Sequence, residues 1–137
     1  VDNTRFWKGK PNAVAKIMGD KFFEIRTRQP LRIGTAGDQQ AVAFKGYRLV
    51  DRYPEFHFTV GGVDVYELVT TNENGTALIR TFRIPDVDQD VWFYRHSNDG
   101  VRYESSAGAW EQNRIKISPD NARKFTITMT KTEGGKK

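Results

Sequence analysis

Three carboxylates stand at alternate positions in one short segment, as Asp86, Asp88 and Asp90. Calcium binds several oxygen ligands supplied by flexible loops, and this spacing could provide three of them. The segment does not complete the EF-hand pattern, because Val91 occupies the position of the required glycine and Ser97 that of the bidentate glutamate. The three aspartates are therefore a candidate calcium site, and the simpler interpretation is an acidic connection between two strands.

Aromatic and basic side chains form a second group with recognisable chemistry. Trp7 and Trp110 have polar neighbours near predicted turns, and Tyr94 ends a run of three aromatic residues that begins at Trp92. A flat ring beside an arginine suits a sugar, which offers an apolar face and hydroxyl edges. Packing in the core is the alternative for these rings, above all for Trp92. The candidate ligand-binding residues are Trp7, Tyr94, Arg95, Arg102 and Trp110.

Residues for catalysis and for transition metals are sparse. The two histidines, His57 and His96, lack the H-x-H or H-E-x-x-H spacing of metal sites. The absence of cysteine excludes disulfides, a thiolate nucleophile and cysteine-ligated metals. The sequence contains no G-x-S-x-G elbow, P-loop or dinucleotide fingerprint. No catalytic residue is predicted, and calcium is the one cofactor that the residues allow.

A carbohydrate-active enzyme would need two carboxylates that face each other across the glycosidic bond. Four carboxylates lie close together in the sequence, but no pattern places any two of them face to face. Solvated charges on the outward faces of strands explain them more simply. These residues are Asp51, Glu55, Asp64 and Glu67.

The net charge of +5 is spread along the chain rather than gathered in blocks. A basic surface attracts nucleic acid, anionic glycans or an acidic protein, and it also serves solubility alone. The run Phe44-Lys45-Gly46-Tyr47-Arg48 superficially suggests an RNA-binding strand. The motif is incomplete, and the helices that such a domain needs are not predicted. Nucleic acid is therefore not the expected partner.

Short alternating runs of β-branched and aromatic residues predict the elements that must position these side chains. Gly61-Gly62 is the strongest hairpin signal between them, because primed turns need positive φ. Segments 72–75 and 97–100 are further hairpin-type turns, and Gly46 indicates a β-bulge. The expected strands are Lys21–Thr27, Leu31–Ile33, Ala41–Val50, Glu55–Val60, Val63–Thr70, Thr76–Ile84, Val91–Arg95, Val101–Ser105, Ala109–Ile117 and Arg123–Thr130.

This pattern predicts one all-β domain over residues 1–137. The expected architecture is an antiparallel β-sandwich of about nine or ten strands, with a closed β-barrel as the alternative. No long helix is expected, and no apolar stretch is long enough to span a membrane. The chain begins at Val1 rather than Met, so we expect a processed product or a fragment of a larger protein.

Several runs resemble a β-rich region of large secreted multidomain proteins of planctomycete-type bacteria. The runs are Phe44–Leu49, Pro54–Phe58, Val63–Glu67, Arg80–Phe82 and Val91–Tyr94. Those proteins often also carry c-type cytochrome domains and propeller domains like those of sugar dehydrogenases. The resemblance covers residues 41–95. It implies an accessory module of a periplasmic or secreted protein connected with carbohydrate or redox metabolism, and it carries over no catalytic residue.

The leading hypothesis is a non-catalytic binding module with a carbohydrate as its ligand. Trp7, Tyr94 and Trp110 would provide stacking surface, while Arg95 and Arg102 would donate hydrogen bonds to hydroxyls or carboxylates. One alternative is a structural or interaction domain whose basic surface docks a redox partner or a neighbouring protein domain. The other alternative is a carbohydrate-active enzyme.

Overall fold

The computed structural model describes residues 28–95 and 100–131. Trp7, His96 and the predicted strand Lys21–Thr27 lie outside the described residues. Within them the chain forms ten strands and one short helix. The bounds are β1 Leu31–Ile33, β2 Val42–Val50, β3 Tyr53–Val60, β4 Val63–Thr71, β5 Ala77–Arg83, β6 Val91–Tyr94, β7 Val101–Ser105, β8 Ala109–Glu111, β9 Arg114–Ile117, α2 Pro119–Ala122 and β10 Lys124–Lys131.

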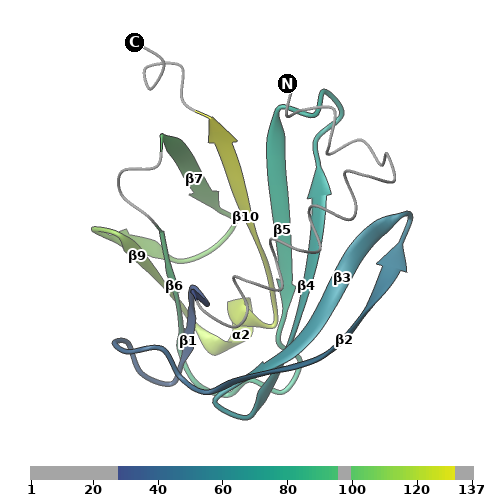
Figure 1. Ribbon diagram of the computed structural model, residues 1–137. Helices are drawn as coiled ribbons and strands as arrows, with labels where there is room; N and C mark the ends of the chain where they lie inside the picture. The colour runs from purple at the N-terminus through teal and green to yellow at the C-terminus, as the bar shows by residue number, and fades with distance from the viewer. Residues whose placement is uncertain (1–27, 96–99, 132–137) are drawn as a thin grey trace.

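These strands form two antiparallel sheets (Figure 1). One sheet has four strands in the order β1-β6-β9-β8, and the other has six in the order β2-β3-β4-β5-β10-β7. Figure 1 shows β1, β6 and β9 on one side of the molecule, while the larger sheet curves from β7 round to β2. The predicted all-β sandwich is confirmed, and the alternative of a closed barrel is wrong because the two sheets do not join into one. In the part of the chain that the structure describes, no helix has the length and apolar character of a membrane crossing.

Two of the predicted turns join neighbouring strands of the larger sheet. Gly61 and Gly62 have φ of 56° and 83° and connect β3 to β4, as the hairpin signal indicates. The turn from β4 to β5 is closed by Asn72, whose side-chain oxygen accepts hydrogen bonds from the backbone N–H groups of Thr76 at 2.8 Å and Ala77 at 3.2 Å. Local turn chemistry therefore sets the order β3-β4-β5.

The predicted bulge lies in β2, where the pairing with β3 shifts between Phe44 and Gly46. Gly46 has φ of 143°, a conformation that side chains with a Cβ rarely adopt. Because the bulge inserts one residue, Gly46 stands opposite His57 in β3. This register leaves no β2 side chain beside the His57 ring at that position.

The predicted third hairpin, between β6 and β7, is wrong. β6 pairs with β1 and β9 in the four-stranded sheet, whereas β7 pairs with β10 in the six-stranded sheet. β6 and β7 therefore belong to different layers. Phe93 of β6 and Tyr103 of β7 are both buried and meet across the core, with ring centroids 6.2 Å apart.

The expected single strand Ala109–Ile117 is two strands, β8 and β9, which pair with each other as a hairpin. The chain reverses between Glu111 and Arg114, and Gln112 there has positive φ of 63°. No glycine or proline marks this turn in the sequence, so the local signal for it was missing.

Three phenylalanines hold the two sheets together. Phe82 and Phe125, on neighbouring strands of the larger sheet, have ring centroids 5.1 Å apart, and Phe93 of the smaller sheet meets Phe82 at 5.9 Å. All three side chains are buried. Alternation along β10 likewise turns Phe125 and Ile127 into the core and packs Met129 against it, as predicted.

Two charged side chains lie in this core. Glu67 of β4 and Arg80 of β5 form an ion pair of 2.7 Å, and their side chains are 0% and 5% exposed. The Arg80 guanidinium also lies 5.4 Å from the ring centroids of Phe82 and Phe93. The expectation that Glu67 is a solvated charge on an outward strand face is therefore wrong, because strand alternation turns it inward beside the buried Val65 and Val69.

Candidate functional site

The outer face of the four-stranded sheet gathers rings and charges. On β6 the core residue Phe93 points inward, so Trp92 and Tyr94 point outward and share one face. Both rings are half-buried. Strand pairing brings basic side chains beside them from β1 and β9. We call this surface the aromatic face, and its residues are Arg32, Trp92, Tyr94, Arg114 and Lys116.

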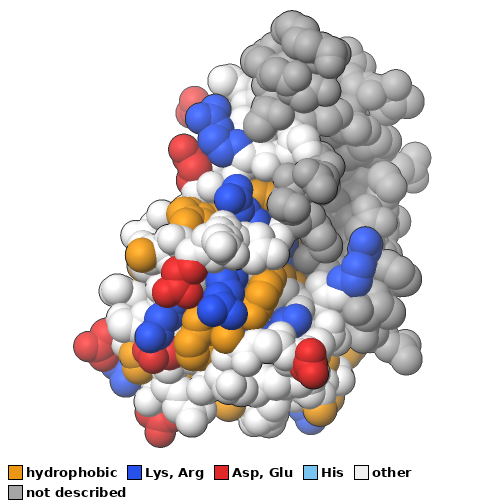
Figure 2. All heavy atoms as spheres, turned by 90° about the vertical axis from the view of Figure 1, so that its left-hand side faces the viewer, with side chains coloured by type: hydrophobic (Ala, Val, Ile, Leu, Met, Phe, Trp, Pro, Cys, Tyr) orange, Lys and Arg blue, Asp and Glu red, His pale blue; other side chains and the backbone are white. Residues whose placement is uncertain are grey.

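The aromatic face consists of two cross-strand rows. In the first row Trp92 lies between Arg32 and Lys116, and the Lys116 ammonium is 5.8 Å from the Trp92 ring centroid. In the second row Tyr94 pairs with Arg114. Figure 2 looks onto this side of the molecule and shows basic side chains beside and over hydrophobic ones. In such contacts the cation lies over one face of the ring and helps to hold the ring in place.

Tyr94 is held in place by three neighbours. Its hydroxyl accepts hydrogen bonds from the Gly37 backbone N–H at 3.0 Å and from Arg114 at 3.2 Å, while the Arg32 guanidinium lies 4.8 Å from its ring centroid. Burial alone would raise the pKa of Tyr94. The hydrogen bonds from Arg114 and Gly37, with the charges of Arg114 and Arg32, outweigh burial and lower this pKa below its ordinary value.

Replacing Arg114 with methionine should therefore raise the pKa of the Tyr94 phenol. The pKa is measured from the ultraviolet absorbance of tyrosinate as the pH rises. Subtracting the titration of Tyr94→Phe isolates the signal of Tyr94 from those of the other tyrosines. Because the pKa of Tyr94 is lower in the folded state than in the unfolded state, ionised Tyr94 stabilises the fold at a pH above the ordinary tyrosine pKa. This stabilisation is lost as the pH falls through the folded-state pKa. Arg114→Met should therefore lose this stabilisation at alkaline pH, whereas Arg123→Met, remote from the ring, should keep it. An unchanged Tyr94 titration in Arg114→Met would contradict the assignment.

The charges of the aromatic face are nearly balanced. Lys116 lies 3.7 Å from the Asp90 carboxylate, and Arg114 lies 3.4 Å from the Glu111 carboxylate. These pairs are well exposed, so each adds little to stability. The two ion pairs place hydrogen-bond donors and acceptors beside the rings of Trp92 and Tyr94. This arrangement suits a ligand with hydroxyl groups better than a strongly anionic ligand.

The structure separates the residues that the sequence groups as one ligand surface. Trp110 pairs with the buried Ile115 and packs against the core, so it faces the opposite side of the sheet from Tyr94. Arg95 accompanies Trp110, with its guanidinium 5.0 Å from the ring centroid. Arg102 is exposed on β7 in the other sheet. Trp7 lies outside the described residues.

The candidate calcium ligands do not form a cluster. Among residues 28–95 and 100–131, no group of three or more histidine, aspartate or glutamate side chains could hold a metal ion. Asp86 and Asp88 are exposed, and the Asp90 carboxylate lies beside Lys116 instead. The buried Val87 between them anchors the segment to the core. The structure supports the simpler interpretation, an acidic connection between β5 and β6.

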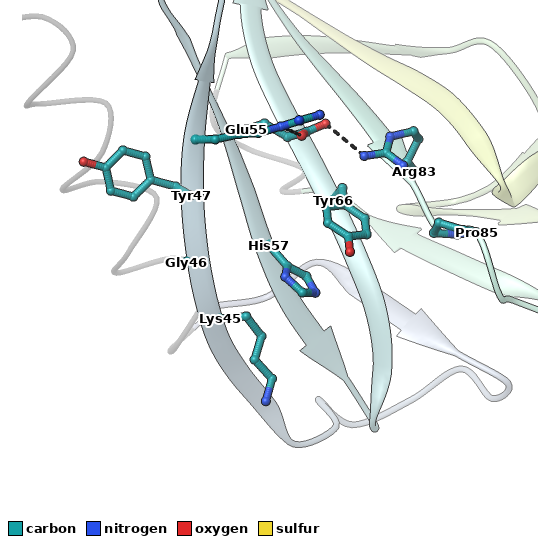
Figure 3. Close-up of a pocket in the computed structure, with 9 residues that line it drawn as sticks. Lys45, Gly46, Tyr47, Glu55, His57, Tyr66, Arg83 and Pro85 are labelled. Atoms are coloured by element: carbon teal, nitrogen blue, oxygen red, sulfur yellow. Dashed lines mark hydrogen bonds and ion pairs between the residues drawn. The ribbon is translucent and has the colours of Figure 1, made fainter.

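A groove of about 530 Å³ crosses the outer face of the six-stranded sheet (Figure 3). Residues from β2, β3, β4 and β5 line it, and Pro85 follows β5. Figure 3 shows the Tyr47 side chain pointing away from the other lining side chains. We call this site the cationic groove, and its lining residues are Lys45, Gly46, Tyr47, Arg48, Glu55, His57, Tyr66, Arg83 and Pro85.

A cross-strand stack forms the floor of the cationic groove. The rings of His57 and Tyr66 are stacked with centroids 4.4 Å apart, and the Arg83 guanidinium lies 4.5 Å from the Tyr66 centroid. The register His57–Tyr66–Arg83 across β3, β4 and β5 makes this stack continuous. Asp64 accepts a 2.8 Å hydrogen bond from His57 Nε2 and fixes the orientation of the ring. Beyond His57, at Gly46, an added methyl group would have no neighbour within 4 Å.

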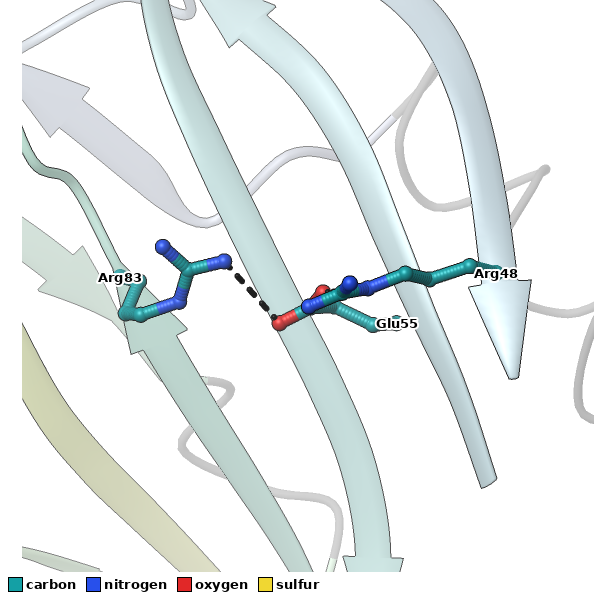
Figure 4. A network of polar contacts seen from close by, with 3 residues as sticks. All are labelled: Arg48, Glu55 and Arg83. Carbon is teal, nitrogen blue, oxygen red and sulfur yellow. Dashed lines mark hydrogen bonds and ion pairs between the residues drawn. The ribbon is translucent and has the colours of Figure 1, made fainter. Parts of the chain in front are cut away.

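Glu55 ties the two arginines of the groove together (Figure 4). One of its oxygens lies 2.7 Å from Arg48 Nε, and the other lies 3.4 Å from an Arg83 terminal nitrogen. Its side chain is only 9% exposed, whereas that of Arg48 is 69% exposed. Glu55 is the one carboxylate among the described lining residues. The groove therefore combines three cations with one anion whose two oxygens are already engaged.

Sequence reasoning missed the groove and part of the aromatic face. Trp92 is not among the predicted ligand-binding residues, although alternation around the core residue Phe93 places it beside Tyr94. The His57–Tyr66 pair follows from counting outward from the Gly61-Gly62 turn. Arg32, Arg114 and Lys116 had no local signal, because they reach the rings through pairings between distant strands.

Comparison with protein-family models, curated proteins and solved structures finds no match to this chain. The resemblance of residues 41–95 to secreted planctomycete-type proteins therefore stays a prediction. The function has to be inferred from the geometry of the two surfaces alone.

Proposed function

We propose that this domain is a non-catalytic binding module whose aromatic face takes a carbohydrate, and that it serves an extracytoplasmic protein. The observation that carries the proposal is the pair Trp92 and Tyr94. These two half-exposed rings stand two residues apart on one strand, with charged side chains beside each. Such a strip offers consecutive stacking positions along β6.

The chemistry of the aromatic face favours a neutral glycan. Sugar rings have an apolar face that packs on an aromatic ring, and their hydroxyls both donate and accept hydrogen bonds. The pairs Lys116–Asp90 and Arg114–Glu111 supply donors and acceptors on the same face as the rings. Because these opposite charges neutralise each other, an uncharged ligand loses little by approaching them.

The cationic groove supports binding rather than glycoside hydrolysis. Hydrolysis by the common mechanism needs one carboxyl group as acid and a second as nucleophile or base. Among the described lining residues Glu55 stands alone, and both of its oxygens lie against arginines. A carboxylate held in this way orders its neighbours and is poorly placed to donate a proton.

Replacing Trp92 with alanine should weaken the binding of a neutral β-glucan or xylan oligomer about tenfold, or about 1.4 kcal/mol. The loss arises because one stacking ring disappears while the charged pairs remain. Isothermal titration of the whole chain against a panel of neutral and acidic polysaccharides measures this effect. Tyr94→Ala should behave similarly, and Trp92→Phe should retain most of the affinity.

Two outcomes would remove this proposal. One is the absence of heat with every neutral glycan of the panel. The other is full retention of affinity by Trp92→Ala and Tyr94→Ala together, with thermal unfolding showing that both variants are folded. Binding to the aromatic face should also change little with salt, because the ligand is uncharged.

A further inference from the structure

We infer that the cationic groove is a second, separate ligand site, and that its ligand is a short acidic oligosaccharide. The site lies on the outer face of the six-stranded sheet, whereas the aromatic face lies on the four-stranded sheet. The inference therefore does not depend on the function proposed above. Four observations carry it: the positive charge, the placement of the cations, the open position beside His57 and the anchoring of the arginines.

The charge of the groove is positive. Lys45, Arg48 and Arg83 line it, and Glu55 is the one carboxylate among the described lining residues. The formal sum of these four side chains is three positive charges and one negative charge, or +2, and Asp64, which accepts a hydrogen bond from His57, lowers it to +1. An anionic ligand is therefore attracted to the groove.

The cations are spread along the groove rather than gathered at one point. Lys45 and Arg48 come from β2, and Arg83 comes from β5, three strand spacings away. Neighbouring strands lie about 4.8 Å apart, so the backbones of Arg48 and Arg83 are about 14 Å apart, but their guanidinium groups reach toward each other and share the Glu55 carboxylate. Lys45 stands away from this pair, on the other side of Gly46 (Figure 3). A ligand with more than one negative charge would engage both places, which favours an oligomer.

The open position beside His57 accepts a ring. One face of the imidazole stacks on Tyr66, while the other faces Gly46, the residue without a side chain. Apart from its chain neighbours Lys45 and Tyr47, an added methyl group at Gly46 meets nothing within 4 Å, so no other part of the chain that the structure describes fills this position. Lys45 lies next to it, as Figure 3 shows. A sugar ring seated there would have its apolar face on the imidazole and an acidic substituent near the ammonium group.

Arg48 and Arg83 are preorganised for an oxyanion. Glu55 holds Arg48 through Nε, and the Arg48 side chain is 69% exposed (Figure 4). The guanidinium of Arg83 is fixed between Glu55 and the Tyr66 ring. Because both cations are already held in position, a ligand loses less side-chain entropy on binding. Guanidinium groups suit carboxylate and sulfate through paired hydrogen bonds.

The same geometry argues against single-stranded nucleic acid. Proteins that bind such strands stack successive bases on exposed aromatic faces. In the groove His57 covers one face of Tyr66, and Arg83 from the opposite neighbouring strand covers the other. Only the outer face of His57 remains for stacking, so the groove offers one ring position rather than a series.

The test is isothermal titration of the whole chain with a short oligogalacturonide and with its fully methyl-esterified counterpart. We expect the acid form to bind and the ester to bind at least about tenfold more weakly. Affinity for the acid should fall as salt rises, because the Debye length shrinks from about 30 Å in dilute buffer to about 8 Å at physiological ionic strength. The double variant Lys45→Gln/Arg48→Gln should weaken binding at least about tenfold.

A matched variant separates this site from general charge attraction. Arg102→Gln/Arg123→Gln removes the same two charges from exposed positions outside the groove and should retain affinity. His57→Ala should weaken binding, and Trp92→Ala should leave it unchanged. Equal weakening by both double variants, equal affinity for acid and ester, or tighter binding of oligodeoxythymidylate would each overturn the inference. Failure of glycan binding at the aromatic face would not affect it.

Discussion

Replacing Arg80 with methionine should destabilise the fold by about 3–5 kcal/mol. Arg80 forms an ion pair of 2.7 Å with Glu67 inside the sandwich, where the two side chains are 5% and 0% exposed. Removing the guanidinium takes away the cation that offsets the desolvation of the buried Glu67 carboxylate. Chemical denaturation of Arg80→Met and of the unaltered chain measures the difference in unfolding free energy.

The double variant Glu67→Leu/Arg80→Met should recover most of this loss. Removing both charges removes the desolvation cost, and apolar side chains of similar size fill the same space. Arg123→Met is the matched control, because the ion pair between Arg123 and Asp120 is exposed. Its loss should lower the unfolding free energy by less than about 1 kcal/mol. If Arg80→Met were as mild as this control, the buried pair would not be a determinant of stability.

The buried pair Glu67–Arg80 also shows how well strand alternation predicts which side chains face the core. In β4 the inward positions are Val65, Glu67 and Val69, and alternation alone assigns all three to the core. The polar side chain of Glu67 argued for the surface and led to the wrong assignment. What decides its position is Arg80 on β5, which lies two residues from Phe82, the direct partner of Glu67, and could not be identified before the β4–β5 register was known.

Turn chemistry predicts local pairing well and the assignment of strands to sheets poorly. Gly61-Gly62 fixes Val60 opposite Val63, and counting outward places His57 opposite Tyr66, as the structure has it. Segment 97–100 also carries a hairpin-type turn signal, yet β6 and β7 belong to different sheets. Pairing across a turn is a local property, whereas the choice of sheet depends on burial partners distant in sequence, such as Phe93 and Tyr103.

The same distinction explains which parts of the two surfaces could be predicted. Tyr94 was identified from its residue type, and Trp92 follows from its place two residues earlier on the same strand. The basic partners Arg32 and Arg114 reach Tyr94 through strands β1 and β9, and no local pattern links them to it. In the groove the bulge position was predicted, but its effect on register was not, so the space at Gly46 beside His57 appeared only in the structure.

Replacing Phe82 with alanine should also destabilise the fold by about 3–5 kcal/mol. Phe82 has no exposed surface and touches Phe125 within its own sheet and Phe93 in the other, with centroids 5.1 Å and 5.9 Å apart. Truncation removes buried apolar surface and leaves a cavity at the contact between the sheets, which the surrounding rings can only partly fill. Thermal and denaturant unfolding of the variant measure the effect.

Two further variants show whether the loss reflects contact between the layers. Phe82→Leu keeps much of the volume and should cost less than about 1.5 kcal/mol. Leu49→Ala removes an apolar side chain that is 57% exposed at the edge strand β2, so it should stay within about 0.5–1 kcal/mol of the unaltered chain. The sandwich requires this order of effects, because its stability comes from burial between the two sheets. If Phe82→Ala cost no more than Leu49→Ala, the packing of the four-stranded sheet on the six-stranded sheet would be wrong.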